Sequence, residues 1–289
     1  MPIELRLWWS VLIAVAVFNV AVWACLAATH GRQRPWVPDA EFRARQLGLL
    51  LAAGYVFGCA YRSLFPVFDV PRITLVDSWL ASALVGRSVA TVAELCFAAQ
   101  WALPMRELAA FDGGRRAARA AVLVLPLIVV AECASWHSVI TGMNLGHVIE
   151  ETLWGICAVL VLAGLWSVRS AVAPAQRGLL KVGIVTCAGY AAYMFAVDVP
   201  QYFSRWMADL HAGREFAALG EGVADAALRR HVLHDWQVWR GEVVWMTAYF
   251  SVGVWVSLAL AVLSPRIRHA DVRLPRAPRK AGAVLHPAV

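Results

Sequence analysis

Five ionisable side chains lie within twenty residues of one another in a strongly apolar part of the chain. They are Glu132, His137, His147, Glu150 and Glu151. An ionisable group at bilayer depth costs several kcal/mol unless it is paired, hydrated or bound to a ligand. This cluster is therefore the first candidate for a functional site.

The spacing within the cluster suits ligands of a divalent metal ion. His147 precedes Glu150 by three residues and Glu151 by four, so one helix face can present an imidazole together with a carboxylate. Zinc and iron both accept such ligands. The expected metal ligands are Glu132, His137, His147 and Glu150, with His231 or His234 completing the set.

Two further side chains are expected to act on the substrate. Glu151 would serve as the general base or acid, and Arg87 would hold an anionic headgroup or orient a carboxylate. The apolar runs contain four glutamates, which are Glu94, Glu132, Glu150 and Glu151. If all four are ionised, Arg87 leaves three negative charges that protons, Arg62 or a bound cation must offset. A single divalent ion nearly suffices.

The chain as a whole is too apolar for an ordinary soluble domain. Of its 289 residues 61% are hydrophobic, and the mean hydropathy is +0.62. Seven runs are long enough to cross a bilayer: residues 7–28, 47–65, 79–103, 117–140, 145–166, 179–197 and 243–263. They predict an all-α, multi-pass membrane bundle with seven transmembrane spans.

Basic residues alternate between the two sides of the predicted bundle. Arginines gather after the first, third and fifth runs and in the carboxyl-terminal tail, whereas the other connections are poorly charged or balanced. By the positive-inside rule the amino terminus is outside and the carboxyl terminus is in the cytoplasm. The net charge of +7 and the pI of about 9.4 therefore reflect topology, and no nucleic-acid partner is expected.

This topology places the cluster at one depth in the outer leaflet. At about 1.5 Å per helical residue, Glu132 lies about 12 Å and Glu150 about 8 Å from the outer ends of their runs. Arg87 falls at a similar level. The coincidence favours a functional site over the structural interpretation, in which Arg87 and Glu94, two turns apart on one helix face, only neutralise each other.

Two segments lie outside the predicted spans. Within a membrane domain of residues 1–264, the long connection 201–240 predicts an extracytoplasmic amphipathic lid. Residues 265–289 combine prolines with arginines and are expected to form a disordered, basic cytoplasmic tail. The arginine-rich, lysine-poor composition suggests the inner (plasma) membrane of a bacterium.

Three functions fit the polar cluster. The first is a metal-dependent membrane enzyme, a hydrolase or an oxidoreductase, that acts on a lipid or other apolar substrate. The second is a proton- or cation-coupled transporter or channel in which Glu94, Glu132 and Glu151 relay protons or bind the cation. The third is a receptor or assembly subunit. A retinal protein is excluded because the last run contains no lysine for a Schiff base.

Overall fold

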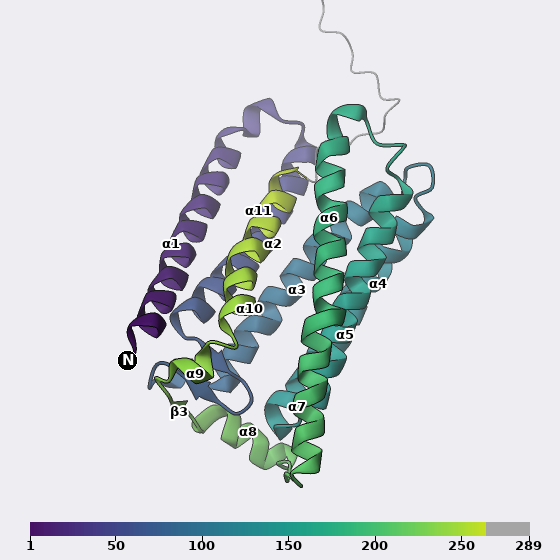
Figure 1. Cartoon of the computed structure of the whole chain (residues 1–289). Helices are drawn as coiled ribbons and strands as arrows, with labels where there is room; N and C mark the ends of the chain where they lie inside the picture. Colours follow the sequence, from purple (N-terminus) through teal and green to yellow (C-terminus); the bar gives the residue numbers. More distant parts are fainter. Residues whose placement is uncertain (264–289) are drawn as a thin grey trace, which may run out of the picture.

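The protein is a bundle of long helices (Figure 1). The computed structural model describes residues 1–263, so the predicted tail of residues 265–289 lies outside the described part. The all-α class predicted from the sequence is confirmed. The amino terminus lies toward one end of the bundle, and the last described helix, α11 (Val254–Leu263), runs to the other end (Figure 1).

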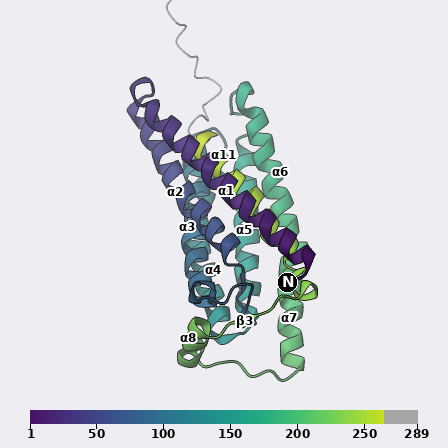
Figure 2. The ribbon, with the colours of Figure 1, turned by 90° about the vertical axis from the view of Figure 1, so that its left-hand side faces the viewer.

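Six helical segments are long and apolar enough to cross a membrane, which gives an integral membrane protein. They are α1 (Ile3–Arg32), α2 (Asp39–Leu64), α4 (Arg115–Thr141), α5 (Leu145–Ser167), the segment Pro174–His211, and the segment Val243–Val262. Figure 2 shows α1 crossing in front of the other helices, at the edge of the bundle. The short 3₁₀ helices η1 (Arg34–Trp36), η2 (Trp79–Ala81) and η3 (Pro174–Gln176) precede α2, α3 and α6.

The third predicted span is a helix but is not one of these six. It is α3 (Ala83–Leu108), and the polar residues Arg87, Glu94 and Gln100 lower its hydropathy. All three are buried, because α3 lies inside the bundle with α2 on one side and α4 on the other. The structure thus shows six sufficiently apolar helices where the sequence analysis predicts seven spans.

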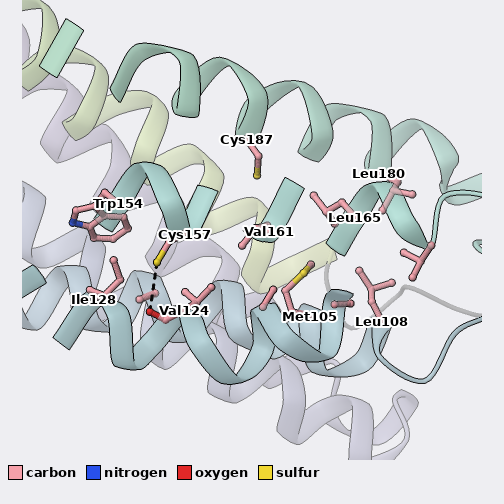
Figure 3. Close-up of a cluster of buried hydrophobic side chains, with 14 of the residues drawn as sticks. Met105, Leu108, Val124, Ile128, Trp154, Cys157, Val161, Leu165, Leu180 and Cys187 are labelled. Atoms are coloured by element: carbon pink, nitrogen blue, oxygen red, sulfur yellow. Dashed lines mark hydrogen bonds between the residues drawn. The ribbon is translucent and has the colours of Figure 1, made fainter. Parts of the chain in front are cut away.

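Two apolar cores hold the bundle together. The first packs α3, α4, α5 and α6 (Arg177–Tyr193) and includes Met105 and Leu165 (Figure 3). In this core the Cys157 thiol donates a hydrogen bond to the Val124 carbonyl (Figure 3). The second packs α1, α2, α10 (Val243–Ala248) and α11, with Tyr55 at its centre. The cavity described below lies between the two cores.

Small residues bring α2 and α3 into close contact. An added Cβ at Gly54 would lie 2.5 Å from the Cys96 sulfur, and one at Gly58 would lie 2.7 Å from the Ala93 Cβ. The two glycines are four residues apart, on one face of α2. Such small-residue spacing lets helix backbones approach in a membrane, where close van der Waals packing replaces the hydrophobic effect as the force between helices.

The sixth predicted span is longer than its apolar run. α6 continues through a π-helical turn, η4 (Met194–Asp198), into α7 (Val199–His211). Pro200 lies just after this turn; its ring nitrogen cannot donate a helical hydrogen bond, so the ladder is loosened there. The first part of the predicted 201–240 connection is therefore an extension of the span. A second π-helical turn, η5 (Tyr249–Gly253), joins α10 to α11.

The remainder of that connection lies across one end of the bundle (Figure 1). It contains α8 (Leu219–Leu228), β3 (His231–Val232) and α9 (Trp236–Trp239). β3 pairs in parallel with β2 (Ile73–Thr74), and β2 pairs in antiparallel fashion with β1 (Val67–Phe68). This small sheet attaches the connection to the loop between α2 and α3.

Arg72 fixes α8 to the end of α4. Its buried guanidinium donates to the carbonyls of Val139 at 2.8 Å and Ile140 at 3.4 Å, and it forms an ion pair with Asp225 of α8. A cation is favourable here because the last carbonyls of a helix carry partial negative charge. The backbone of Arg72 itself has a φ of 72°, a conformation that few non-glycine residues adopt.

The contact between α8 and α4 can be tested at two glycines of α8. A Cβ at Gly222 would lie 2.1 Å from the Ile140 carbonyl oxygen, whereas nothing lies within 4 Å of one at Gly220. Gly222→Val should lower the free energy of unfolding by about 1–3 kcal/mol more than Gly220→Val, because both add the same residue but only one collides with backbone. Thermal denaturation of the purified protein measures the difference. Equal stabilities would show that α8 is not packed on α4.

Candidate functional site

Arg87 lies at the centre of a buried cluster of carboxylates. Its Nη1 donates to Glu150 Oε1 at 3.0 Å, and its Nη2 donates to Glu94 Oε2 at 3.0 Å and Glu132 Oε2 at 2.6 Å. Each of the four side chains belongs to a residue at most 5% exposed. We call these four residues the Arg87 cluster. The cluster ties together α3, α4 and α5, because it takes residues from all three helices.

Further hydrogen bonds fix the carboxylates of the Arg87 cluster. Thr91 donates to Glu132 Oε2 at 2.6 Å, and Tyr249 of η5 donates to Glu94 Oε1 at 3.0 Å. His147 Nδ1 lies 2.9 Å from Glu150 Oε2, as its three-residue spacing on α5 allows. Each carboxylate thus has a partner besides Arg87, and each therefore has a defined orientation.

The charges of the Arg87 cluster do not balance. One guanidinium faces three carboxylates, which leaves two negative charges if all three are ionised. Glu132 Oε1 and Arg87 Nε are buried and have no hydrogen-bond partner among residues 1–263. Uncompensated charge in a region of low polarity is costly, and protons or a cation could offset it.

Three residues of the Arg87 cluster could hold a metal ion. One oxygen from each of Glu94, Glu132 and Glu150 lies within 4.8 Å of the others. Three carboxylates suit a hard divalent ion better than they suit zinc, which prefers sulfur and nitrogen. The Arg87 guanidinium already binds all three, so an ion would compete with it for the same oxygens.

The structure brings together only some of the residues that the sequence analysis singles out. Glu132, His147, Glu150 and Arg87 are in mutual contact or share a partner. His137 is exposed on α4, since five residues separate it from Glu132 and the two side chains leave different faces of the helix.

The two histidines of the connection 201–240 are also outside the Arg87 cluster. The exposed His231 lies in β3, where its backbone N–H donates to the Arg72 carbonyl. His234 Nε2 lies 2.9 Å from the Leu75 carbonyl oxygen. Pairing with β2 therefore orients this segment along the sheet, and neither histidine lines the cavity beside the cluster.

Glu94 is the third carboxylate of the candidate metal site, where the sequence predicted histidine ligands. From the sequence, Glu94 was expected only as a partner of Arg87 or as a proton relay. The signal for its place was the seven-residue spacing from Arg87, and the ion pair that the structural alternative required is present at 3.0 Å. The spacing did not show that Glu132 and Glu150 share the same guanidinium.

A cavity of about 600 Å³ opens beside the Arg87 cluster. One wall comes from α2, α10 and η5, and the other from α5, α6, η4 and α7. Its aromatic lining includes Tyr55, Phe97, Trp101, Trp154, Tyr190, Tyr202 and Trp245. Both π-helical turns reach it, through Asp198 of η4 and Tyr249 of η5. Such turns occur often at functional sites, where they displace side chains from regular helical positions.

Glu151 is a free carboxylate in this cavity. It is half-buried, follows Glu150 directly and lines the cavity wall on α5. Among residues 1–263 it forms no hydrogen bond and no ion pair, in contrast to the three carboxylates held by Arg87. It is therefore available to a molecule bound in the cavity.

The rim of the cavity is apolar and exposed. Val185 of α6 is 70% exposed and Val244 of α10 is 69% exposed, and both line the cavity. At another part of the lining, Arg205 of α7 forms a 2.9 Å ion pair with Glu242, the residue before α10. The cavity thus has apolar residues at its edge, on surfaces that a bilayer would cover, and ionisable residues inside.

Comparison with known proteins gives no family for this chain. No family model, no curated protein and no solved structure matches it. Its function is therefore inferred from the chemistry of the site.

The charge balance of the Arg87 cluster predicts that two substitutions by uncharged glutamine differ in their effect on stability. Arg87→Gln strands three buried carboxylates and should lower the free energy of unfolding by roughly 3–5 kcal/mol. Glu132→Gln removes one negative charge and leaves Arg87 two partners, so it should cost much less. Adding Glu132→Gln to Arg87→Gln should restore part of the loss. Thermal denaturation of the three variants gives the order, and an Arg87→Gln protein as stable as the wild type would contradict it.

Proposed function

We propose that this protein is a membrane-embedded enzyme that acts on a lipid-like, amphipathic substrate from the outer leaflet. The observation that carries this proposal is the cavity, with free and paired ionisable groups inside and exposed apolar side chains at its rim. Its volume of about 600 Å³ falls within the range of small-molecule sites, which are mostly apolar with a few convergent polar groups. A rim on the lipid-facing surface admits a substrate directly from the bilayer.

The cavity residues have different roles in this proposal. Glu151 is the general acid or base, because its carboxylate reaches the cavity without a protein partner. Arg87 is a positioning residue: its Nη1 and Nη2 already donate to carboxylates, which leaves them unsuited to hold an anionic headgroup. A carboxylate base beside an apolar pocket serves hydrolysis best among the reactions considered, since it can activate water.

The proposed divalent ion belongs at the carboxylates of Glu94, Glu132 and Glu150. His147 would orient Glu150 from behind, as outer partners of metal ligands commonly do. The ion would supply the positive charge that the cluster lacks, and iron or manganese suits three oxygen ligands better than zinc does.

In this proposal the protein crosses a bacterial inner membrane seven times. α3 would be the seventh span: it has 26 residues, and its polar side chains face protein rather than lipid. An odd number of crossings agrees with the ends of the described chain, which lie toward opposite ends of the bundle (Figure 1). The side with the amino terminus and α8 would be outside.

A proton- or cation-coupled transporter is the second candidate. The observation in its favour is the pair of uncompensated charges in the Arg87 cluster, which protons can offset as well as a metal ion can. Against it, the apolar core that includes Met105, Leu108, Leu165 and Leu180 fills the part of the bundle away from the cluster (Figure 3). A coupled transporter would have to open this packed region.

Metal content tests the proposed ligands. In wild-type protein a divalent ion should copurify in stoichiometric amount, and Glu94→Gln combined with Glu132→Gln should remove it, because a carboxamide is a much weaker ligand. His231→Ala combined with His234→Ala should keep it, since both histidines lie at the sheet. Elemental analysis of the purified wild type and of both double variants measures the metal content. Loss of metal in the histidine variant alone would restore the histidines as ligands.

Lipid conversion tests the enzyme. Wild-type protein reconstituted with a bacterial lipid extract should generate a new lipid product, detected by mass spectrometry. Glu151→Gln should slow its formation by about 10²–10⁴-fold, the usual contribution of general acid–base catalysis. Glu107→Gln is the matched control, because Glu107 is exposed near the far end of α3. The enzyme proposal fails if wild type and Glu151→Gln give identical lipid profiles.

A further inference from the structure

Arg62 is a buried cation without a partner. It lies near the end of α2, is 6% exposed and lines the cavity. In the described part of the chain it forms no hydrogen bond and no ion pair, and its Nε is buried without an acceptor. Its guanidinium carbon is 5.9 Å from the centre of the Trp245 ring and 6.0 Å from that of Phe250. Among residues 1–263, the favourable contacts of its guanidinium are thus with the faces of these two aromatic rings.

The Arg87 cluster does not neutralise Arg62. The cavity carboxylate Glu94 is bound by Arg87 and by Tyr249. A guanidinium stays protonated in proteins, so Arg62 cannot avoid the cost of burial by losing its proton. Contacts with aromatic rings offset only part of that cost. A buried, permanently charged arginine that faces a cavity is therefore a site for an oxyanion, which accepts two parallel hydrogen bonds from its planar fork.

The opposite wall of the cavity carries carboxylates, in contrast to the guanidinium of Arg62. Glu151 on α5 lines the cavity together with the carboxylates of Glu150, its neighbour in sequence, and Asp198 of η4. The aromatic residues Tyr190 of α6 and Tyr202 of α7 line the same wall. Carboxylates beside aromatic rings form a favourable site for an ammonium group.

We propose that the cavity binds a zwitterionic amphipath, with its oxyanion at Arg62 and its ammonium group at Glu151. Arg62 and Glu151 are on different walls and do not pair with each other, so one ligand with both charges satisfies both. The apolar rim at Val185 and Val244 accommodates the alkyl chain. This inference rests on the proposed function and specifies its substrate class.

Binding of four probes with the same alkyl chain tests the inference. They are octyl phosphoethanolamine, octyl phosphate, octylammonium and octanol, titrated by calorimetry into the purified full chain in a neutral detergent. The zwitterion should bind most tightly. Arg62→Met should weaken octyl phosphoethanolamine and octyl phosphate by at least about tenfold and leave octylammonium unchanged. Glu151→Gln should weaken octyl phosphoethanolamine and octylammonium and leave octyl phosphate unchanged. Inorganic phosphate separates a lipid-like ligand from the free anion, and it should bind far more weakly than octyl phosphate.

Arg45→Met is the matched control. Arg45 is a buried arginine on the same helix, but it is paired with Glu41. Without any probe, Arg45→Met should lower the melting temperature, whereas Arg62→Met should raise it or leave it unchanged, because it removes an unpaired buried charge. If Arg62→Met does not fold, Arg62→Lys keeps the charge but loses the fork, and it should still weaken octyl phosphate.

Two results would overturn the inference: octanol binding as tightly as the zwitterion, or equal binding of octyl phosphate by wild type and Arg62→Met. Charge-selective binding without conversion of any lipid would support this inference and remove the proposed enzyme. Lipid conversion without charge-selective binding would support the proposed enzyme and contradict this inference.

Discussion

The structure depends on one guanidinium that serves three helices. Arg87 can be buried only because Glu94, Glu132 and Glu150 surround it, and these carboxylates can be buried only because Arg87 binds them. A bilayer has no water to hydrate a stray charge, so α3, α4 and α5 must keep the register that holds the four side chains together. The same need explains why α3, which lacks an apolar stretch long enough to cross a membrane, lies between α2 and α4.

The cluster also explains why the bundle is not packed throughout. Side chains committed to Arg87 cannot fill the neighbouring space, and the two apolar cores lie on either side of it. The π-helical turns η4 and η5 lie in opposite walls, where they place Asp198 and Tyr249 at the cavity. The cavity thus lies where the Arg87 cluster, the two π-helical turns and the two apolar cores meet.

The distribution of charge around the cavity separates two roles. Carboxylates held by Arg87 or, like Glu242, by Arg205 maintain the walls. Within residues 1–263, Arg62 and Glu151 have no hydrogen bond or ion pair, so a ligand with both charges could offset the cost of their burial. An apolar rim and an interior with both signs of charge match the two ends of an amphipathic molecule.

The sequence by itself determined the helices and the level of the polar layer. Hydropathy and length identify membrane-spanning helices because a bilayer demands both. The seven-residue spacing of Arg87 and Glu94 offered their ion pair as the structural alternative, because that spacing is local to one helix. Local spacing also predicted the contact between His147 and Glu150. The extension of α6 to His211 escaped prediction, since polar residues beyond the apolar run look the same in a helix as in a loop.

Only the tertiary structure decided which side chains share a site. Glu132 and Glu150 meet Arg87 because three helices pack side by side, a relation that no spacing along the chain encodes. His137 leaves the other face of α4, and strand pairing holds the segment that carries His231 and His234 at one end of the bundle. Nearness in sequence suggested a histidine-rich metal site, but the faces on which helices contact one another produced a carboxylate cluster around an arginine.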